Sequence, residues 1–147
     1  MSDKVVFIVL NSAIKSRIVC DLAEKCYLDG KRLVIFSEKK ETCTSLDAML
    51  WTWKQQSFIP HKCLDSLNEA QSEPVVLTNN IISAAEYDTL MLHDPAPIEI
   101  ICQFSNIIDF AEKYDTPALE KSRQRYKKYR DQNYSIETLQ PGEFLHT

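Results

Sequence analysis

The sequence predicts an α/β fold, a three-layer α/β/α sandwich around a mostly parallel sheet of about five strands. Continuous apolar runs at residues 5–10 and 33–36 indicate strands that are buried on both faces. Helical spacing of apolar residues over 13–29 separates them, and a strand, a crossover helix and a second strand form the unit from which parallel sheets are built. The same alternation of patterns continues along the chain.

The first two helices are predicted from spacing and from their end residues. Asn11 and Ser12 are expected to cap the helix over 13–29, and Gly30 to end it. A second helix is predicted over 41–53, with apolar residues at steps of three and four.

Further elements follow in the second half of the chain. Short apolar runs predict strands at 74–78 and 89–92, and adjacent isoleucines favour a strand over a helix at 104–110. A long helix is predicted over 116–131, with Pro117 in its first turn, where a missing N–H is tolerated.

The length of 147 residues predicts a single domain over 1–147, with residues 140–147 as a loose tail. No secretory signal is recognisable, and no apolar stretch approaches the ~20 residues of a membrane span, so we expect a cytoplasmic protein without membrane association. Five cysteines form an odd set without a CxxC pair. They are expected to be reduced thiols, most of them buried.

Positive charge is concentrated in the predicted C-terminal helix. The stretch SRQRYKKYR, residues 122–130, holds five cations and two tyrosines, and Lys121 adds a sixth cation. The whole chain has 17 basic and 21 acidic residues and a formal net charge of −4, so the rest of it carries −10 without those six cations. Charge segregated in this way favours an anionic partner.

Helical geometry divides these side chains among several faces. A central stripe contains Leu119, Ser122, Tyr126 and Tyr129. One row of cations contains Arg123, Lys127 and Arg130, and the row on the other side of the stripe contains Lys121, Arg125 and Lys128. The back of the helix contains Glu120, Gln124 and Asp131. The rings are expected to dock toward the body of the protein, between the two rows.

Three interpretations fit this helix. It is a solvated amphipathic helix whose cations complement its own dipole and nearby carboxylates, or it binds one of two kinds of anion. Single-stranded nucleic acid would stack its bases on the tyrosines, but an acidic body repels a polyanion beyond the local patch. An acidic peptide fits best, because an arginine can hold a terminal carboxylate while an apolar side chain enters beside a tyrosine.

A second aromatic segment lies at the end of the second predicted helix. The stretch LDAMLWTWKQQSFIPH, residues 46–61, contains Trp51, Trp53, Phe58 and His61. These rings belong either to the core or to a protein interface, since each tryptophan N–H needs a partner and exposed rings of this kind anchor interfaces.

Together the two segments resemble the chi subunit family of bacterial DNA polymerase III. The first family pattern is matched by Leu46-Asp47, Leu50-Trp51 and Ser57-Phe58-Ile59-Pro60-His61. The second is matched by Arg123, Arg125-Tyr126 and Tyr129-Arg130. The resemblance spans nearly the whole chain. It implies a Rossmann-like fold that uses no nucleotide and a non-catalytic adaptor of the clamp-loader assembly.

The resemblance also implies partners and sites. The family binds the acidic, phenylalanine-terminated tail of the single-stranded DNA-binding protein, and so contacts DNA indirectly. By motif, this tail is expected to meet Arg123, Tyr126, Lys127 and Arg130. The family's other surface binds the psi subunit, where a psi subunit is present, and is expected to include Trp51 and Phe58.

Two residues of this chain depart from the family pattern. Leu119 stands where the family often has a lysine, so part of the charge recognition is weaker here or is taken over by Lys121. Asn133 stands where a glycine is common after the helix, and asparagine also tolerates the left-handed conformation of such a turn.

No catalytic residue, metal site or cofactor is predicted. The loop over 11–16 contains no glycine, and neither a GxGxxG nor a Walker A sequence is present. His61, Cys63 and the His93-Asp94 pair lack a further ligand at fixed spacing, and His61 is expected to be a structural hydrogen-bonding residue. The alternative functions are a direct single-stranded nucleic-acid-binding module and an adaptor for a repair helicase.

Overall fold

The computed structural model of the protein describes residues 3–54 and 56–146, and within these ranges seven strands form one parallel sheet. The strands are β1 (Lys4–Leu10), β2 (Leu33–Phe36), β3 (His61–Leu64), β4 (Val75–Thr78), β5 (Thr89–Leu92), β6 (Asn106–Glu112) and β7 (Ser135–Leu139). The helices are α1 (Lys15–Leu28), α2 (Lys40–Thr52), α3 (Ile98–Ile101), α4 (Thr116–Asp131) and α5 (Pro141–Leu145). The strands lie in the order β3-β4-β2-β5-β6-β1-β7.

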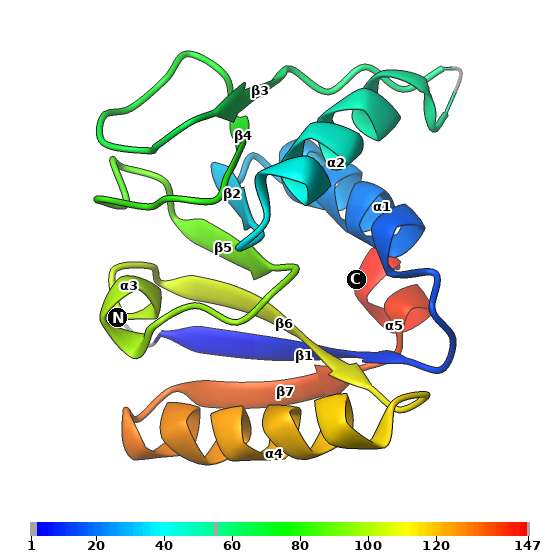
Figure 1. Cartoon of the computed structure of the whole chain (residues 1–147), viewed down its shortest axis with the longest axis vertical. Coiled ribbons are helices and arrows are strands. Elements are labelled where there is room, and N and C mark those ends of the chain that lie inside the picture. The colour runs from blue at the N-terminus through cyan, green and yellow to red at the C-terminus, as the bar shows by residue number, and fades with distance from the viewer. Residues whose placement is uncertain (1–2, 55, 147) are drawn as a thin grey trace.

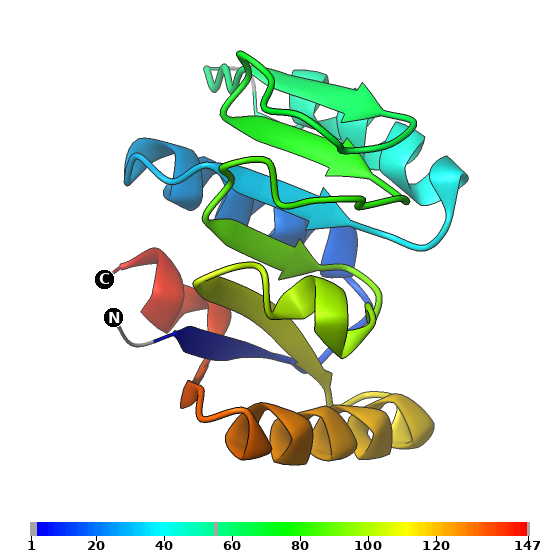
Figure 2. The same cartoon turned by 90° about the vertical axis from the view of Figure 1, so that its left-hand side faces the viewer.

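Helices cover both faces of the sheet, which confirms the predicted three-layer architecture. Figures 1 and 2 show α1, α2 and α5 on one face and α3 and α4 on the other. Alternate residues of β1 enter the two cores. Val6 and Ile8 pack with residues of α1 and α2, whereas Val5 and Phe7 pack with residues of α3 and α4. The continuous apolar run of this strand therefore reflects burial on both sides.

The sheet has two more strands than the five expected from the sequence. The additional strands, β3 and β7, are its two edges. An edge strand has a neighbour on one side only and keeps polar residues, so neither HKCL nor SIETL forms the apolar run that revealed the inner strands. The strand predicted at 104–110 is present as β6, shifted by two residues.

The segment over 140–147, expected as a loose tail, contains a helix instead. Residues 141–145 form α5, which begins with a capping box between Gln140 and Glu143. Phe144 and Leu145 pack against the core on the α1 face. Thr147 lies outside the described residues.

The start of α1 differs from the prediction, and its end agrees. Ile14 is the N-cap and no side chain caps the helix, whereas Asn11 donates a hydrogen bond to the Gln140 side chain at 3.5 Å. At the other end Gly30 has φ +76°, and the N–H of Lys31 donates to the carbonyl of Cys26 at 2.9 Å. This is the left-handed helix stop that a glycine there predicts.

The sequence also led to expectations about the cysteines and about membrane-spanning segments. All five cysteines are free, and three of them are buried. Among the described residues, no helix is long and apolar enough to cross a bilayer.

The turn between α4 and β7 depends on Asn133, which has φ +64° as predicted. The N–H of Tyr134 donates to the carbonyl of Tyr129 at 3.1 Å, and the N–H of Asn133 donates to the carbonyl of Arg130 at 3.0 Å. These bonds satisfy the last carbonyls of α4 and reverse the chain into the edge strand.

The Asn133→Ala variant should unfold with a free energy about 1 kcal/mol lower than the parent chain, because alanine lacks the side chain that makes the left-handed conformation tolerable. The Asn133→Gly variant should stay within about 0.5 kcal/mol, since glycine adopts this conformation freely. Urea unfolding of the three proteins measures both differences. Equal stability of the alanine and glycine variants would contradict the claim that the positive φ at residue 133 destabilises the alanine variant.

Candidate protein-binding surfaces

Helix α4 carries the predicted cationic site, and its first turn is fixed by local contacts. The Asp115 carboxylate accepts a hydrogen bond from the N–H of Ala118 at 3.2 Å, and Pro117 occupies the first turn. Both features satisfy or remove N–H groups that the helix itself leaves unpaired.

A buried carboxylate on β6 joins α4 to the sheet. Asp109, which is 2% exposed, accepts two hydrogen bonds from Arg125, from Nε at 2.8 Å and from Nη2 at 3.1 Å. It also accepts from the Tyr129 hydroxyl at 2.6 Å and from the N–H of Phe110 at 2.7 Å. A buried charge with four donors is compensated by charge-assisted bonds, so Asp109 fixes both the position and the rotation of α4.

The protonation states of this network follow from burial and from Asp109. Burial and the nearby carboxylate raise the pKa of Tyr129 far above its usual value, so its hydroxyl remains a donor. Burial alone would lower the pKa of Arg125, but the hydrogen bonds and charge of Asp109 outweigh burial and raise it. Arg125 is therefore a fixed cation.

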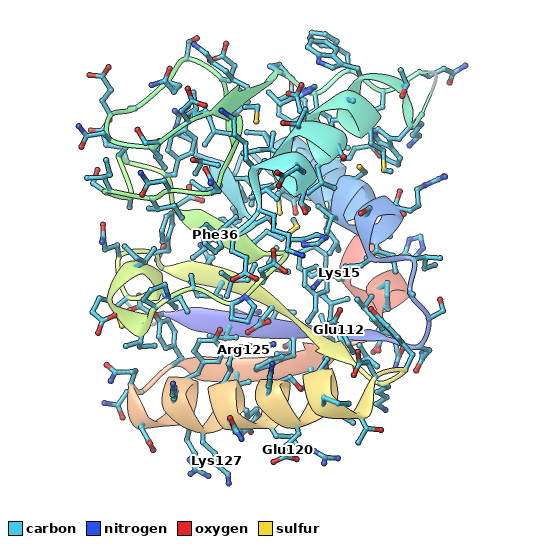
Figure 3. The ribbon with its side chains drawn as sticks, viewed as in Figure 1. Lys15, Phe36, Glu112, Glu120, Arg125 and Lys127 are labelled. Atoms are coloured by element: carbon cyan, nitrogen blue, oxygen red, sulfur yellow. The ribbon has the colours of Figure 1, made fainter. Side chains whose placement is uncertain are left out.

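A groove of about 450 Å³ runs along the other side of α4. It is lined from α4 by Leu119, Glu120, Ser122, Arg123, Tyr126, Lys127 and Arg130. It is lined from the sheet by Phe7 of β1, Ala111 of β6 and Thr138 of β7. The groove thus brings together the four residues predicted to meet an acidic tail. Figure 3 shows Lys127 and Glu120 on the side of α4 opposite to Arg125.

The cations at this groove are little compensated by the protein's own carboxylates. Arg123 lies 3.5 Å from Glu120, with side chains 66% and 60% exposed, and Arg130 lies 4.0 Å from Asp131. Pairs this exposed are worth roughly 0.2–1 kcal/mol and yield readily to another anion. Within the described residues Lys127 has no ion pair. The groove therefore keeps a positive rim over an apolar floor.

The structure agrees with one detail of the helix pattern and corrects two. Tyr129 belongs to the core, as expected of a ring that docks toward the body of the protein. Arg125, expected in a second row of cations, is held by Asp109. Glu120, expected at the back, lines the groove. The sheet residues of the groove had no signal in the sequence, because their proximity to α4 depends on how the strands are ordered.

The predicted psi-facing residues form a second exposed patch at the other end of the sheet. Trp51 on the last turn of α2 is 54% exposed, Phe58 is 67% exposed, and their ring centroids lie 5.9 Å apart. The Trp51 ring also lies 4.4 Å from that of His61 on β3. Large apolar rings that remain this exposed are typical of interfaces.

Local contacts hold this patch in place. Glu24 of α1 accepts hydrogen bonds from the Ser57 hydroxyl at 2.5 Å and from Lys54 at 2.9 Å. His61 is buried, and its ring nitrogens contact the carbonyls of Ile59 at 2.6 Å and Asp47 at 3.1 Å. His61 is thus the structural hydrogen-bonding residue that the sequence predicted.

The crevice at the carboxyl ends of the strands, where doubly wound sheets bind ligands, is crossed by internal ion pairs. Lys15 lies 3.3 Å from Glu112 and also donates to the carbonyl of His93, and Arg125 meets Asp109 beside them. Figure 3 shows Lys15, Glu112 and Arg125 near the centre of the molecule. No group of three metal-ligating side chains occurs in residues 3–54 and 56–146.

The sequence from residue 1 to residue 137 matches the family model described as "DNA polymerase III chi subunit, HolC". The chain belongs to the chi subunit family. Members of this family are non-catalytic accessory subunits of the DNA polymerase III holoenzyme, so the chain is an accessory subunit of DNA replication. This confirms the resemblance carried by the two sequence motifs.

Curated chi subunits are similar along most of their length. The chi subunit of Escherichia coli is 25% identical over 122 residues, covering 83% of this chain and 82% of its own. The chi subunit of Pseudomonas aeruginosa is 26% identical over 138 residues, covering 91% and 94%.

Solved structures of other proteins share the fold of this chi-family chain. S. cerevisiae Dbp5 bound to RNA and ADP BeF3 superposes with a TM-score of 0.65 at 13% identity, covering 97% of this chain and 42% of that one. T4 UvsW gives 0.65 at 9% identity, covering 94% and 42%. At these identities the likeness concerns the fold alone.

The Asp109→Asn variant should lower the free energy of unfolding by about 3 kcal/mol, because it leaves the buried Arg125 guanidinium without a compensating charge. Glu137→Gln is the matched control. It breaks the Lys4–Glu137 pair, where the atoms are 3.9 Å apart and both side chains are 48% exposed, and it should change stability by less than about 0.5 kcal/mol. Urea unfolding compares them, and equal effects would show that the network does not hold α4.

Proposed function

We propose that the chain tethers DNA polymerase III to protein-coated single-stranded DNA. The groove beside α4 takes the acidic C-terminal tail of the single-stranded DNA-binding protein. The patch of Trp51 and Phe58 takes the psi subunit and so bridges to the clamp loader. We place this function in the cytoplasm, where replication proceeds in bacteria.

The observation that carries the proposal is the meeting of four predicted residues at one groove. Arg123, Lys127 and Arg130 give the groove a positive rim, and the Tyr126 ring, 43% exposed, lies 6.0 Å from the Phe7 ring at its floor. A peptide that ends in an aromatic residue carries a carboxylate and an apolar ring on the same residue. The rim suits the carboxylate and the floor suits the ring.

The distance between the two surfaces supports the adaptor role. Trp51 and Phe58 adjoin β3, whereas the groove adjoins β7, and these strands are opposite edges of the sheet. Six inter-strand steps of about 4.8 Å separate the edges. Two partners can therefore be held at once without contact between them.

Direct binding of single-stranded nucleic acid is less favoured by the geometry. Base stacking along a strand needs successive exposed rings, but Tyr129 is buried and Tyr126 alone of the α4 tyrosines reaches the groove. Arg125 is likewise unavailable to phosphates.

Replacing Arg123 or Lys127 by alanine should weaken binding of a synthetic acidic peptide that ends in phenylalanine by about tenfold, because a charge-assisted hydrogen bond is worth roughly 1.5–3 kcal/mol. Lys128→Ala is the matched control, since Lys128 lies on the same helix but borders a different depression, beside Pro95 and Ile98. It should stay within about twofold.

Isothermal titration calorimetry measures the three affinities, and thermal melts check folding. Equal losses in all three variants would indicate general charge attraction rather than this groove. Tight binding of a labelled oligonucleotide in low salt, with no binding of the peptide, would support the nucleic-acid function instead.

Trp51→Ala and Phe58→Ala should abolish capture of the psi subunit at micromolar concentration and leave the affinity for the acidic peptide unchanged, because exposed aromatic rings at interface centres contribute several kcal/mol. Arg123→Ala should do the reverse. Pull-down with purified psi subunit, paired with peptide titration, tests whether each variant loses only one of the two binding activities. Loss of both activities in one variant would refute two independent surfaces, and capture of a repair helicase in place of psi would reassign the patch.

A further inference from the structure

The edge strand β7 has main-chain groups that point away from the sheet. In a parallel ladder the N–H and C=O of a residue point to the same neighbour, and successive residues alternate. The N–H of Ser135 donates to the carbonyl of Asp3 at 2.9 Å, and β7 runs in register with β1. Ser135, Glu137 and Leu139 therefore face β1, and the N–H and C=O groups of Ile136 and Thr138 point outward.

Nothing in the described residues pairs with these outward groups. The sheet ends at β7, and within residues 3–54 and 56–146 no hydrogen bond reaches the N–H of Ile136 or Thr138. Helix α4 packs on one face of the sheet and α5 on the other, and neither adds a strand to the outer edge of β7.

The open edge adjoins the groove. Thr138 pairs in register with Phe7, and both side chains lie on the α4 face, where both line the groove. A chain lying extended in the groove therefore has its main chain beside the outward groups of β7. Its side chains would alternate between the groove and the solvent.

The charged side chains near this edge favour an acidic peptide as the occupant. Arg123, Lys127 and Arg130 line the same groove as Thr138. The acidic residue of β7 itself, Glu137, has its side chain on the opposite face, near Lys4 at 3.9 Å. An acidic segment that lies extended beside β7 would therefore be close to the cations of the groove.

We propose that the acidic peptide bound in the groove adds itself to the sheet as a short strand, by pairing its main chain with Ile136 and Thr138 at the outer edge of β7. This rests on the proposed function of the groove. With only two residues turned outward, β7 pairs with about three or four residues of the peptide. The cations contact the carboxylates of the peptide and Phe7 contacts its aromatic ring, while pairing with β7 holds its main chain extended.

The first test removes one outward N–H. Thr138→Pro deletes a donor that points away from β1, so the β1–β7 ladder is kept, and edge strands tolerate proline. Its affinity for a synthetic acidic peptide ending in phenylalanine should fall about three- to tenfold. Thr138→Val keeps the N–H and changes only the side chain that lines the groove, so its affinity should fall by less than that of Thr138→Pro. Equal losses in the two variants would overturn the proposal in favour of a side-chain contact.

The second test leaves the protein unchanged. Peptides that are N-methylated at one position at a time should lose affinity at alternate positions, because only every second amide of an added strand points to its neighbour. A flat or non-alternating profile, with binding still dependent on Arg123, would overturn the strand addition and leave the proposed function intact. Absence of any peptide binding would refute both.

Sedimentation of the unliganded chain completes the experiment. A monomer at the concentrations used for titration is expected. A dimer that Thr138→Pro dissociates, with unchanged peptide affinity, would show that the edge pairs with a second copy instead, and would overturn the proposal.

Discussion

The contact between Asp109 and α4 is the constraint on which the candidate groove depends. Arg125 and Tyr129 are one turn apart and bind the same carboxylate, so they fix which face of the helix is turned inward. Arg123 and Lys127, two positions away from Arg125 in either direction, are thereby turned toward the groove. A single buried carboxylate on β6 thus determines which of the cations on one helix remain available.

The arrangement also explains how an acidic protein presents a positive site. Of the six cations between residues 121 and 130, Arg125 forms a buried ion pair with Asp109. Three others, Arg123, Lys127 and Arg130, line the groove, where the nearby carboxylates are exposed and form only weak ion pairs. Screening restricts the influence of the distant negative charges to about a Debye length, roughly 8 Å at physiological ionic strength. The local pattern, rather than the net charge of −4, governs what the groove attracts.

The sequence predicted the layered fold and the inner strands because those strands are buried on both faces, as in VVFIVL and LVIF. It also predicted α4, since helical periodicity acts within one element, and the family motif implied the four residues that line the groove. It missed β3 and β7, whose polar residues reflect an exposed edge. It missed Asp109, Phe7 and Thr138 as neighbours of α4, because those contacts depend on strand order, which composition and periodicity do not encode.

The pairing of β7 with β1 has a consequence for the timing of assembly. Residue 4 aligns with residue 135, so the strand made first acquires its last neighbour only when nearly the whole chain exists. Domains fold as units during synthesis, beginning from the N-terminal side. A nascent chain on the ribosome cannot add β7 to the sheet beside α4 until residue 139 has been made. Fragments released early by stalled translation would therefore lack the edge strand that lines the groove.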